Sequence, residues 1–478
     1  MLCAQQQVSG LIIDAATSKP LSFVNIAVVG STYGTVSNQN GEFTINLDRN
    51  NQNGSIAFHF IGYETIKTEI HDLRDGMTIK MKEKPVKLRA ITIVANPQSP
   101  EELIKKALER KTENYPQIAQ KREVFRRSNN ASHIHAFDIS LNKSNIPEID
   151  EKIINQMVDS IPHYSRSYED NLYTLYTVPV DSGQVKRKIQ GIKTVVLKED
   201  DGGKLEKVEK VITELFNTKT DEKTFWKYKT GPVSLRESHV HISGSNADSV
   251  TIAFVKNDSL YLKNKAILYL LAGDLDWEWD FLQKTNRYKY LNNGIIGIAG
   301  EDAYAISFTG KAGADYQGMI YISIENNAIL RIEYSIKERK KEKGINLLGI
   351  SYGEVEDAGL LLYEKDTFGY FLKYSMRKNS TKYGFNRPIE IIRKQKRTLF
   401  NKKMNAVEMD FNLQGLQESS SETLVVYREG INEEEFSRIY EKGAKPERIT
   451  SYSDSIWKGY SIIEPTKQMK EYKAKIKN

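Results

Sequence analysis

The sequence has very little cysteine, little proline and no long apolar run. Its 478 residues contain a single cysteine, Cys3, which excludes an internal disulfide and any zinc site built from several cysteines. The 12 prolines are too few for a proline-rich scaffold. The longest apolar run, Ala266–Ala272, ends after seven residues, whereas a membrane-spanning helix needs about 20. We therefore predict no transmembrane segment.

The sequence also lacks a strong excess of one charge. It has 69 Lys and Arg against 62 Asp and Glu, a net charge of +7. Short basic clusters occur at 337–343, 393–397 and 467–477, and acidic residues interrupt most of them. A nucleic-acid site needs its cations gathered on one face or along a groove. We therefore predict that these clusters are solvated surface and that nucleic acid is not a partner. The alternative is a site for nucleic acid or another anionic surface.

What the sequence does contain is enough apolar surface for a folded body. Hydrophobic residues make up 39% of the chain and there are 26 tyrosines. These values exclude wholesale disorder and are typical of chains with a sizeable core. By length alone, two or three domains are expected.

The first residues bear on the compartment. Residues 1–6 are similar to the end of a secretory signal around its cleavage site, followed by a strand-like segment. We predict an exported protein, periplasmic or associated with the outer membrane, in which 1–6 is a signal remnant or tail. The alternative is a cytoplasmic protein that truly starts at Met1. Whether Cys3 carries a lipid, and whether a signal peptide is missing upstream, is left open.

Residues 7–83 predict a small all-β domain. Six apolar stretches have roughly ten-residue spacing and alternate with turn signals: 8–13, 24–29, 42–47, 55–60, 65–70 and 77–81. The turn at 38–41 ends in Gly41, which tolerates the positive φ of a tight hairpin. About seven short strands at this spacing indicate a β-sandwich.

This segment also resembles a known domain. The resemblance lies in Val8-Ser9-Gly10, Asp14, Pro20-Leu21, the stretch from Val24 to Gly30, Gly34-Thr35, Asn40-Gly41-Glu42-Phe43 and Phe60-Ile61-Gly62-Tyr63-Glu64. Together they are similar to the carboxypeptidase-regulatory-like domain. The resemblance implies a prealbumin-like β-sandwich of the Gram-negative cell envelope, an accessory module without peptidase chemistry.

The rest of the chain predicts a linker and a larger body. Residues 84–116 read as a connector and a helix, in which Ser99 and Glu102 form a capping box and Pro100 takes the first helical position. Residues 117–478 read as a β-rich α+β domain with a curved antiparallel sheet, loosely similar to the half-barrel of lipoprotein carriers. Its strongest hairpin joins 318–324 to 329–336.

Further elements of the body are predicted from periodicity and caps. Helices are expected at 150–159, 207–216, 433–442 and 465–476. Strands are expected within 248–262 and 274–336, and at 360–363, 370–374, 389–392 and 424–427.

The most ordered local pattern is the segment 274–281. Read as a strand, it has one acidic face, Asp274, Asp276, Glu278 and Asp280, and one apolar face that includes Trp277 and Trp279. One interpretation is that the aromatic face closes a core and the acids are solvated. The other is a ligand face, in which the aromatic rings stack on a sugar or lipid or the acids bind a cation. We take Asp274, Asp276, Trp277, Glu278, Trp279 and Asp280 as candidate ligand-binding residues.

Other chemical motifs are incomplete. His133 with His135, and His239 with His241, are weak candidate metal pairs because residues i and i+2 of a strand share a face, but each pair lacks a third ligand. Ser351 lies in a G-x-S-x-G pattern, yet no histidine follows it, as a nucleophile elbow requires. We predict no catalytic residues, no metal and no cofactor.

The preferred hypothesis is a non-enzymatic envelope protein that binds or assembles with another envelope or outer-membrane protein. The first alternative is a carrier of a lipid or another apolar ligand, and the second is a hydrolase of unrecognised type. An apolar site on the curved sheet favours the carrier, and a filled core with an exposed aromatic patch favours docking. A hydrolase would need paired carboxylates or a serine–histidine contact in a cleft.

Overall fold

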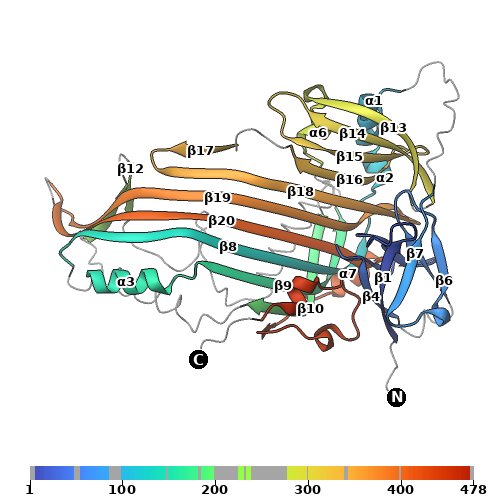
Figure 1. Ribbon diagram of the computed structural model, residues 1–478, viewed down its shortest axis with the longest axis horizontal. Helices are drawn as coiled ribbons and strands as arrows, with labels where there is room; N and C mark the ends of the chain where they lie inside the picture. The colour runs from blue at the N-terminus through green and yellow to red at the C-terminus, as the bar shows by residue number, and fades with distance from the viewer. Residues whose placement is uncertain are drawn as a thin grey trace.

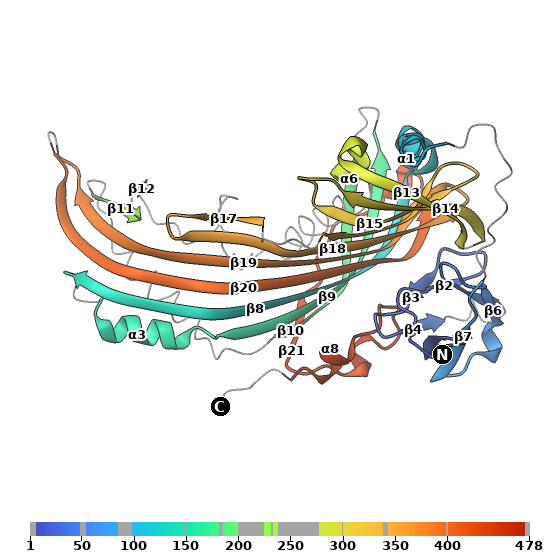
Figure 2. The same ribbon diagram turned by 45° about the horizontal axis from the view of Figure 1, so that its top comes forward.

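The computed structural model shows a long, bent β-sheet with a small β-sandwich packed at one end (Figures 1 and 2). The structure describes residues 6–47, 54–84, 98–146, 149–180, 185–198, 224–230, 233–237, 277–298, 300–337, 343–397 and 400–473. Strands dominate these residues and helices are few, which confirms the predicted mainly-β fold class.

The N-terminal sandwich has seven strands: β1 (Gln6–Asp14), β2 (Asn25–Val28), β3 (Gly34–Val36), β4 (Glu42–Leu47), β5 (Ser55–His59), β6 (Ile66–Glu69) and β7 (Met77–Met81). They form two sheets, β4-β1-β7 and β3-β2-β5-β6, and β1 and β7 are parallel. Phe43 and Phe58 meet edge to face in the core between the sheets. Gly41 has φ 77°, and a Cβ there would lie 2.6 Å from the carbonyl oxygen of Ile12, so the turn requires glycine.

The body is one 14-stranded sheet. Its strands are β8 (Gln120–Ser144), β9 (Tyr164–Pro179), β10 (Val185–Lys198), β11 (Thr224–Thr230), β12 (Val233–Glu237), β13 (Tyr288–Ile298), β14 (Glu301–Gly310), β15 (Tyr316–Ser323), β16 (Ile329–Ile336), β17 (Lys343–Leu347), β18 (Ile350–Asp366), β19 (Gly369–Gln395), β20 (Lys402–Gly430) and β21 (Pro446–Ile449). The main path runs β13-β14-β15-β16-β18-β19-β20-β8-β9-β10-β21. The predicted hairpin is β15–β16.

The strands predicted at 370–374 and 389–392 are both formed, as parts of the single 27-residue strand β19. Pro388 lies inside this strand, although proline has no backbone N–H to donate to a ladder. On one side of β19 it pairs with Asp410 of β20. On the other side, β18 pairs only as far as Phe385 and β11 begins at Glu390, so Pro388 interrupts neither ladder.

The α-helices are α1 (Pro100–Glu109), α2 (Lys111–Asn114), α3 (Glu151–Ser160), α6 (Asp280–Gln283), α7 (Glu433–Arg438) and α8 (Lys467–Glu471), and the 3-10 helices are η2 (Ile70–Asp72), η3 (Thr285–Arg287) and η4 (Asp454–Trp457). The predicted capping boxes at Ser99 and at Asn432 are both formed. The helices α7 and α8 are shorter than predicted. The predicted helix at 207–216 and strands at 248–262 lie outside the described residues. No described helix is long and apolar enough to span a membrane.

The two faces of the sheet carry different parts of the chain. Tyr374, Leu424 and Phe125 lie side by side across β19, β20 and β8 and pack with the sandwich and the C-terminal segment 446–473. We call this the sandwich-bearing face. Leu361 and Tyr363 of β18 point the other way, into a core that contains residues of α1 and α6. We call that side the helix-bearing face.

The sandwich is joined to the sheet by specific contacts. Phe23 stacks on Tyr374 with ring centroids 5.5 Å apart. The Lys373 ammonium donates to the carbonyl oxygen of Thr32 at 2.7 Å, and Thr35 Oγ1 donates to the carbonyl oxygen of Ile462 at 2.9 Å. These buried polar and aromatic contacts fix the sandwich as part of one packed body.

Candidate functional site: an apolar half of the helix-bearing face

The long strands β19, β20 and β8 are amphipathic where they extend away from the sandwich. In β19, residues 375–391 keep an unbroken register with β20, so every odd-numbered residue lies on the helix-bearing face with Leu361. Beyond Thr381, the residues on this face form three rows across the sheet, which are Phe385, Leu413 and Phe137; Arg387, Phe411 and Ile139; and Ile389, Met409 and Leu141. Eight of these nine side chains are apolar.

The aromatic members of this group contact one another and remain part-exposed. Phe411 meets Phe137 at 5.5 Å and Phe385 at 5.6 Å between ring centroids, both edge to face. Tyr383 and Tyr352 extend the group toward the middle of the sheet, and 55% of Tyr352 is exposed. We call the side chains from Tyr383 to Ile391 of β19, with their partners on β18, β20 and β8, the apolar half-face.

The opposite side of the same strands is polar. There Asn386, Asn412 and Asp138 lie side by side, and Asn412 Nδ2 donates to the Asp138 carboxylate at 3.4 Å. Asp410 accepts from Asn142 Nδ2 at 2.9 Å. This side is ordinary solvated sheet, so the apolar residues opposite are not a consequence of general hydrophobicity.

Two apolar elements lie at edges of the apolar half-face, and β11 also pairs with β19 there, at Ile391. At the end of the apolar half-face that is farthest from the sandwich, Ile154 and Met157 of helix α3 pack against Val407 and Met409. Asp150 caps this helix by accepting from the backbone N–H of Ile153 at 2.8 Å. On the other side, the hairpin β17–β18 brings Leu347 and Ile350 alongside, with exposed fractions of 64% and 41%. The result is an apolar surface with an apolar border on each side.

Toward the sandwich the same face becomes polar. Its rows there contain Asn379 with Ser419 and Asn130, and Ser421 with Ser128. The helix-bearing face thus changes along the strands from an apolar half to a half rich in serine and asparagine.

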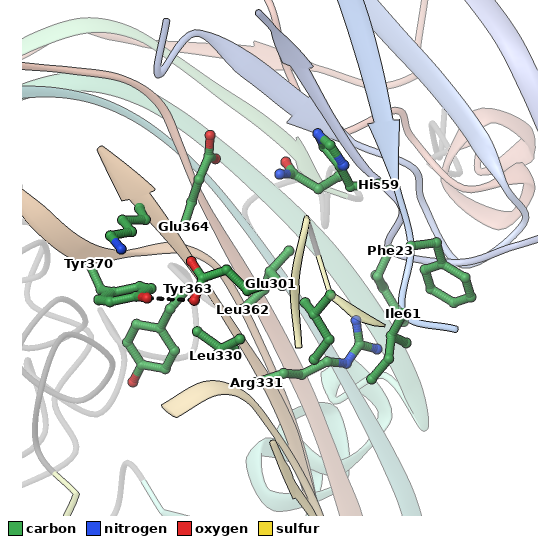
Figure 3. A pocket seen from close by; sticks show the side chains of 14 residues that line it. Phe23, His59, Ile61, Glu301, Leu330, Arg331, Leu362, Tyr363, Glu364 and Tyr370 are labelled. Carbon is green, nitrogen blue, oxygen red and sulfur yellow. Dashed lines mark hydrogen bonds between the residues drawn. The ribbon is translucent and has the colours of Figure 1, made fainter. Parts of the chain in front are cut away.

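A second candidate place is a cavity of about 200 Å³ between the sandwich and the sheet (Figure 3). Tyr370 donates to the Glu301 carboxylate at 2.7 Å across its wall, and the Arg331 guanidinium lies over the Phe60 ring at 5.8 Å. His59 bonds Thr65 through Nδ1 at 3.0 Å. This volume holds about six waters. No serine, threonine or cysteine is among the described residues that line it.

Two ionisable groups lie beside this cavity: Lys373, whose side chain is 0% exposed, and Glu364, whose side chain is 16% exposed. Burial raises the pKa of the Glu364 carboxyl and lowers the pKa of the Lys373 amine. Their charged atoms are 3.7 Å apart. Since the same lysine donates to the Thr32 carbonyl of the sandwich, these groups are best explained as part of the junction between sandwich and sheet.

The segment predicted as an acidic and aromatic strand has a different structure. Residues 277–279 are irregular and α6 begins at Asp280, so the strand assignment was wrong for the described part, 277–281. Trp277 is 1% exposed and donates from Nε1 to the Tyr363 hydroxyl at 2.9 Å. Trp279 stacks on Phe281, and Asp280 pairs with Arg287 at 2.9 Å.

Ligand binding by these residues stays a prediction. Glu278 is exposed, whereas Asp274 and Asp276 lie outside the described residues. The contacts of the two tryptophans are those of a core, which is the first of the two interpretations given above.

The histidine pairs are not assembled into a metal site in the described part of the chain. His133 bonds the Glu418 carboxylate through Nε2 at 2.8 Å. His135 is the extra residue of a β-bulge, because Ile134 pairs with Gly415 and Ala136 with Gln414. The bulge breaks the alternation that would place both rings on one face. His239 and His241 lie outside the described residues, and the described residues contain no group of three potential ligands.

Ser351 lies in a hairpin and not in a nucleophile elbow. Leu348 and Gly349, both with positive φ, form the turn between β17 and β18, and Ser351 is the second residue of β18, opposite Gly384. An elbow needs a helix directly after the serine, and here a 17-residue strand continues instead.

The apolar half-face was not identified from the sequence. Part of its signal was present, since Phe385, Ile389 and Ile391 of β19 are spaced by even numbers of residues, with Asn386 and Glu390 on the alternate positions. The complementary stretch from Val407 to Leu413 alternates in the same way. What the sequence could not show is that three such stretches, far apart in the chain, lie side by side.

Comparison with known proteins identifies the sandwich. Residues 8–93 match the family model described as the CarboxypepD_reg-like domain, which confirms the resemblance stated from the residues. This match covers the N-terminal part of the chain only. No curated protein matches the chain.

Several solved structures match with low similarity. The MucA/MucB complex of Pseudomonas aeruginosa is 6% identical, with 70% of this chain and 99% of that chain covered and a TM-score of 0.17. A LolA superfamily protein from Nitrosomonas europaea is 11% identical, with 66% and 91% covered and a TM-score of 0.16. A putative membrane-associated protein from Bacteroides fragilis is 10% identical, with 90% and 99% covered and a TM-score of 0.13.

Proposed function

We propose that this chain is a non-enzymatic binding protein of the bacterial cell envelope that holds an elongated apolar ligand, such as an acyl chain, on its apolar half-face. The observation that carries the proposal is the set of apolar rows on one face of β19, β20 and β8, opposite polar residues on the other face. Part-exposed apolar patches of this kind mark ligand or interaction sites, because water-facing hydrocarbon is otherwise costly.

The dimensions of the apolar half-face suit one linear chain. From Tyr383 to Ile391 the face extends about 26 Å at ~3.3 Å per residue. The three strands span about 10 Å between the outer strand axes, since neighbouring strands are ~4.8 Å apart. An acyl chain needs about 15 Å, half the thickness of a bilayer core. Each buried methylene contributes about 0.8 kcal/mol.

The polar half of the same face supports an amphiphile over a pure hydrocarbon. Ser421 and Asn130 carry hydrogen-bonding groups on this half of the face, whereas Ser128 accepts from Arg126 and the Asn379 amide bonds Glu354 and Thr381. A ligand with an acyl chain and a polar head can lie along the strands, with the chain on the phenylalanines and the head over these residues. The envelope assignment is supported by the CarboxypepD_reg-like sandwich and by the signal-like first residues.

The competing proposal is docking on an envelope protein. The sandwich is held against the sheet by buried contacts such as those of Lys373 and Phe23. A module fixed in this way presents less free surface to a partner, so the observations favour the sheet as the binding element. The absence of catalytic chemistry stays a prediction.

The test is native mass spectrometry with lipid extraction on protein purified from its own host. We expect a co-purifying acyl-containing species at about one per chain. Recovery of no lipid, together with stoichiometric capture of an envelope protein, would contradict the carrier proposal and favour docking.

A further inference from the structure

The hairpin tip between β19 and β20 has an unusual composition. Between Glu390 and Glu408 the sequence contains six basic residues and no acidic one: Arg393, Lys394, Lys396, Arg397, Lys402 and Lys403. Figures 1 and 2 show this tip at the end of the sheet farthest from the sandwich. The positive charge is therefore concentrated at one extremity of an elongated molecule.

Two acidic residues, Glu390 and Glu408, flank this basic stretch. Glu390 accepts from Lys403 at 3.0 Å and from Lys229 of β11 at 2.8 Å, so two cations share one carboxylate. Glu408 lies 3.9 Å from the same Lys403. Lys396, Arg397 and Lys402 are exposed and lie nearer the turn.

An apolar group projects from the same tip. Phe400 is 86% exposed, the highest value among the exposed large hydrophobic residues of the described chain, and Met404 is 41% exposed. A phenylalanine held in water at the apex of a hairpin contributes nothing to the core. Exposed aromatic side chains with lysine and arginine around them are typical of segments that insert at the interface of anionic membranes.

We propose that the β19–β20 tip docks on an anionic lipid bilayer, with Phe400 inserted at the interface and Lys396, Arg397 and Lys402 against lipid phosphates. Charge complementarity identifies the partner as anionic, and the exposed ring identifies it as one with an apolar interior. A nucleic acid would satisfy the cations only, since no apolar interior would receive Phe400.

This inference goes beyond the proposed ligand site and does not depend on it. The apolar half-face begins at Ile391, directly next to the tip, so a docked tip would place that face beside the membrane. An acyl chain leaving the bilayer would then meet apolar side chains along its path.

The experiment is sedimentation of the full chain with vesicles of neutral phosphatidylcholine, with and without 30% phosphatidylglycerol. We expect binding to the anionic vesicles and little to the neutral ones. Each cation near such a surface contributes about five-fold to partitioning. The triple variant K396Q/R397Q/K402Q should therefore bind about 100-fold more weakly.

Matched variants separate this site from general electrostatics. K19Q/K67Q/K80Q removes three exposed charges from the sandwich and should leave vesicle binding within about two-fold of wild type. Phe400→Ser should weaken binding to anionic vesicles at least about ten-fold. Tyr440→Ser, at a residue 68% exposed outside the tip, should not. The proposal would be overturned if the triple variants of the tip and of the sandwich lost equal amounts of vesicle binding. It would also be overturned if Phe400→Ser bound anionic vesicles as tightly as the unmodified chain.

Two further readouts complete the test. Equally tight binding of duplex DNA at the same salt, abolished by the same triple variant, would assign the tip to polyanions in general and overturn the bilayer assignment. Binding of a soluble fluorescent fatty acid should be unchanged in the tip variants. Loss of vesicle binding with retained fatty-acid binding therefore distinguishes failure of the tip from failure of the ligand site.

Discussion

The buried ion pair between Arg127 and Asp170 should be a main determinant of stability. Arg127 of β8 is 5% exposed and Asp170 of β9 is 1% exposed, and they are joined by two hydrogen bonds of 2.8 and 2.7 Å. Arg127 also donates to the carbonyl oxygen of Ile463 at 2.9 Å, which ties the sheet to the C-terminal segment. Burial lowers the pKa of the arginine, but the carboxylate more than offsets this, so the pKa is raised and the side chain stays charged.

Asp170→Ala leaves the buried Arg127 cation without its hydrogen-bonded carboxylate and with only the smaller influence of the Glu422 charge. We expect a loss of about 3–5 kcal/mol in the free energy of unfolding. The matched control is Glu434→Ala, which breaks the exposed pair of Glu434 with Arg438, 72% and 74% exposed, and should cost about 0.5 kcal/mol or less. R127M/D170L removes both charges and should cost about 1–3 kcal/mol, because only the Ile463 carbonyl is left unpaired.

Urea unfolding followed by tryptophan fluorescence and by far-UV circular dichroism measures these losses. The reasoning predicts the order D170A, then R127M/D170L, then E434A from most to least destabilised. If D170A and E434A shifted the unfolding midpoint equally, or if the double variant were as unstable as D170A, the buried cation left without its carboxylate would not be the cause.

Three further predictions concern other parts of the packed body. Trp457→Ala should cost about 3–5 kcal/mol by urea unfolding, because this 1%-exposed ring of the C-terminal segment packs edge to face on Phe125 of β8 at 5.4 Å. Tyr115→Phe should cost about 1–3 kcal/mol in the same assay, since it removes the hydrogen bond to the Ile329 carbonyl in a buried aromatic cluster. Burial, and then the charge of Lys67, lowers the pKa of His59, so the folded state holds its proton less tightly than the unfolded chain. Stability should therefore fall as the pH drops below about 6.5, and His59→Gln should flatten that slope between pH 7.5 and 5.5.

Local signals in the sequence were sufficient for the sandwich and for the helix starts. The turn ending in Gly41 and the caps at Ser99 and Asn432 are set by neighbours a few residues away, and the structure contains all three. The same applies to the hairpin β15–β16, whose strands are joined by a short turn. These features depend on backbone conformations and hydrogen bonds between residues within a short stretch of sequence.

The long strands and the apolar half-face depend on contacts between residues that are far apart in the sequence. Phe411 meets Phe137 across 274 positions of sequence, and no local pattern specifies that neighbour. The strand prediction for 277–281 was wrong for a different reason, because here a local pattern exists but does not decide the structure. Its alternation is real, but Trp277 and Phe281 are drawn into a core with α1 and Tyr363, and tertiary packing overrides the strand preference.

The measurement that tests the central claim most directly is binding of a fluorescent fatty acid to a pair of neighbouring variants. Phe411→Glu places a charge on the apolar half-face, whereas Asn412→Glu places the same charge one residue away on the polar face of the same strand. We predict that Phe411→Glu weakens binding at least about ten-fold, because the charge must be desolvated beside the ligand. Asn412→Glu should bind as the unmodified chain does. Equal binding by both variants would contradict the assignment of the ligand to this face.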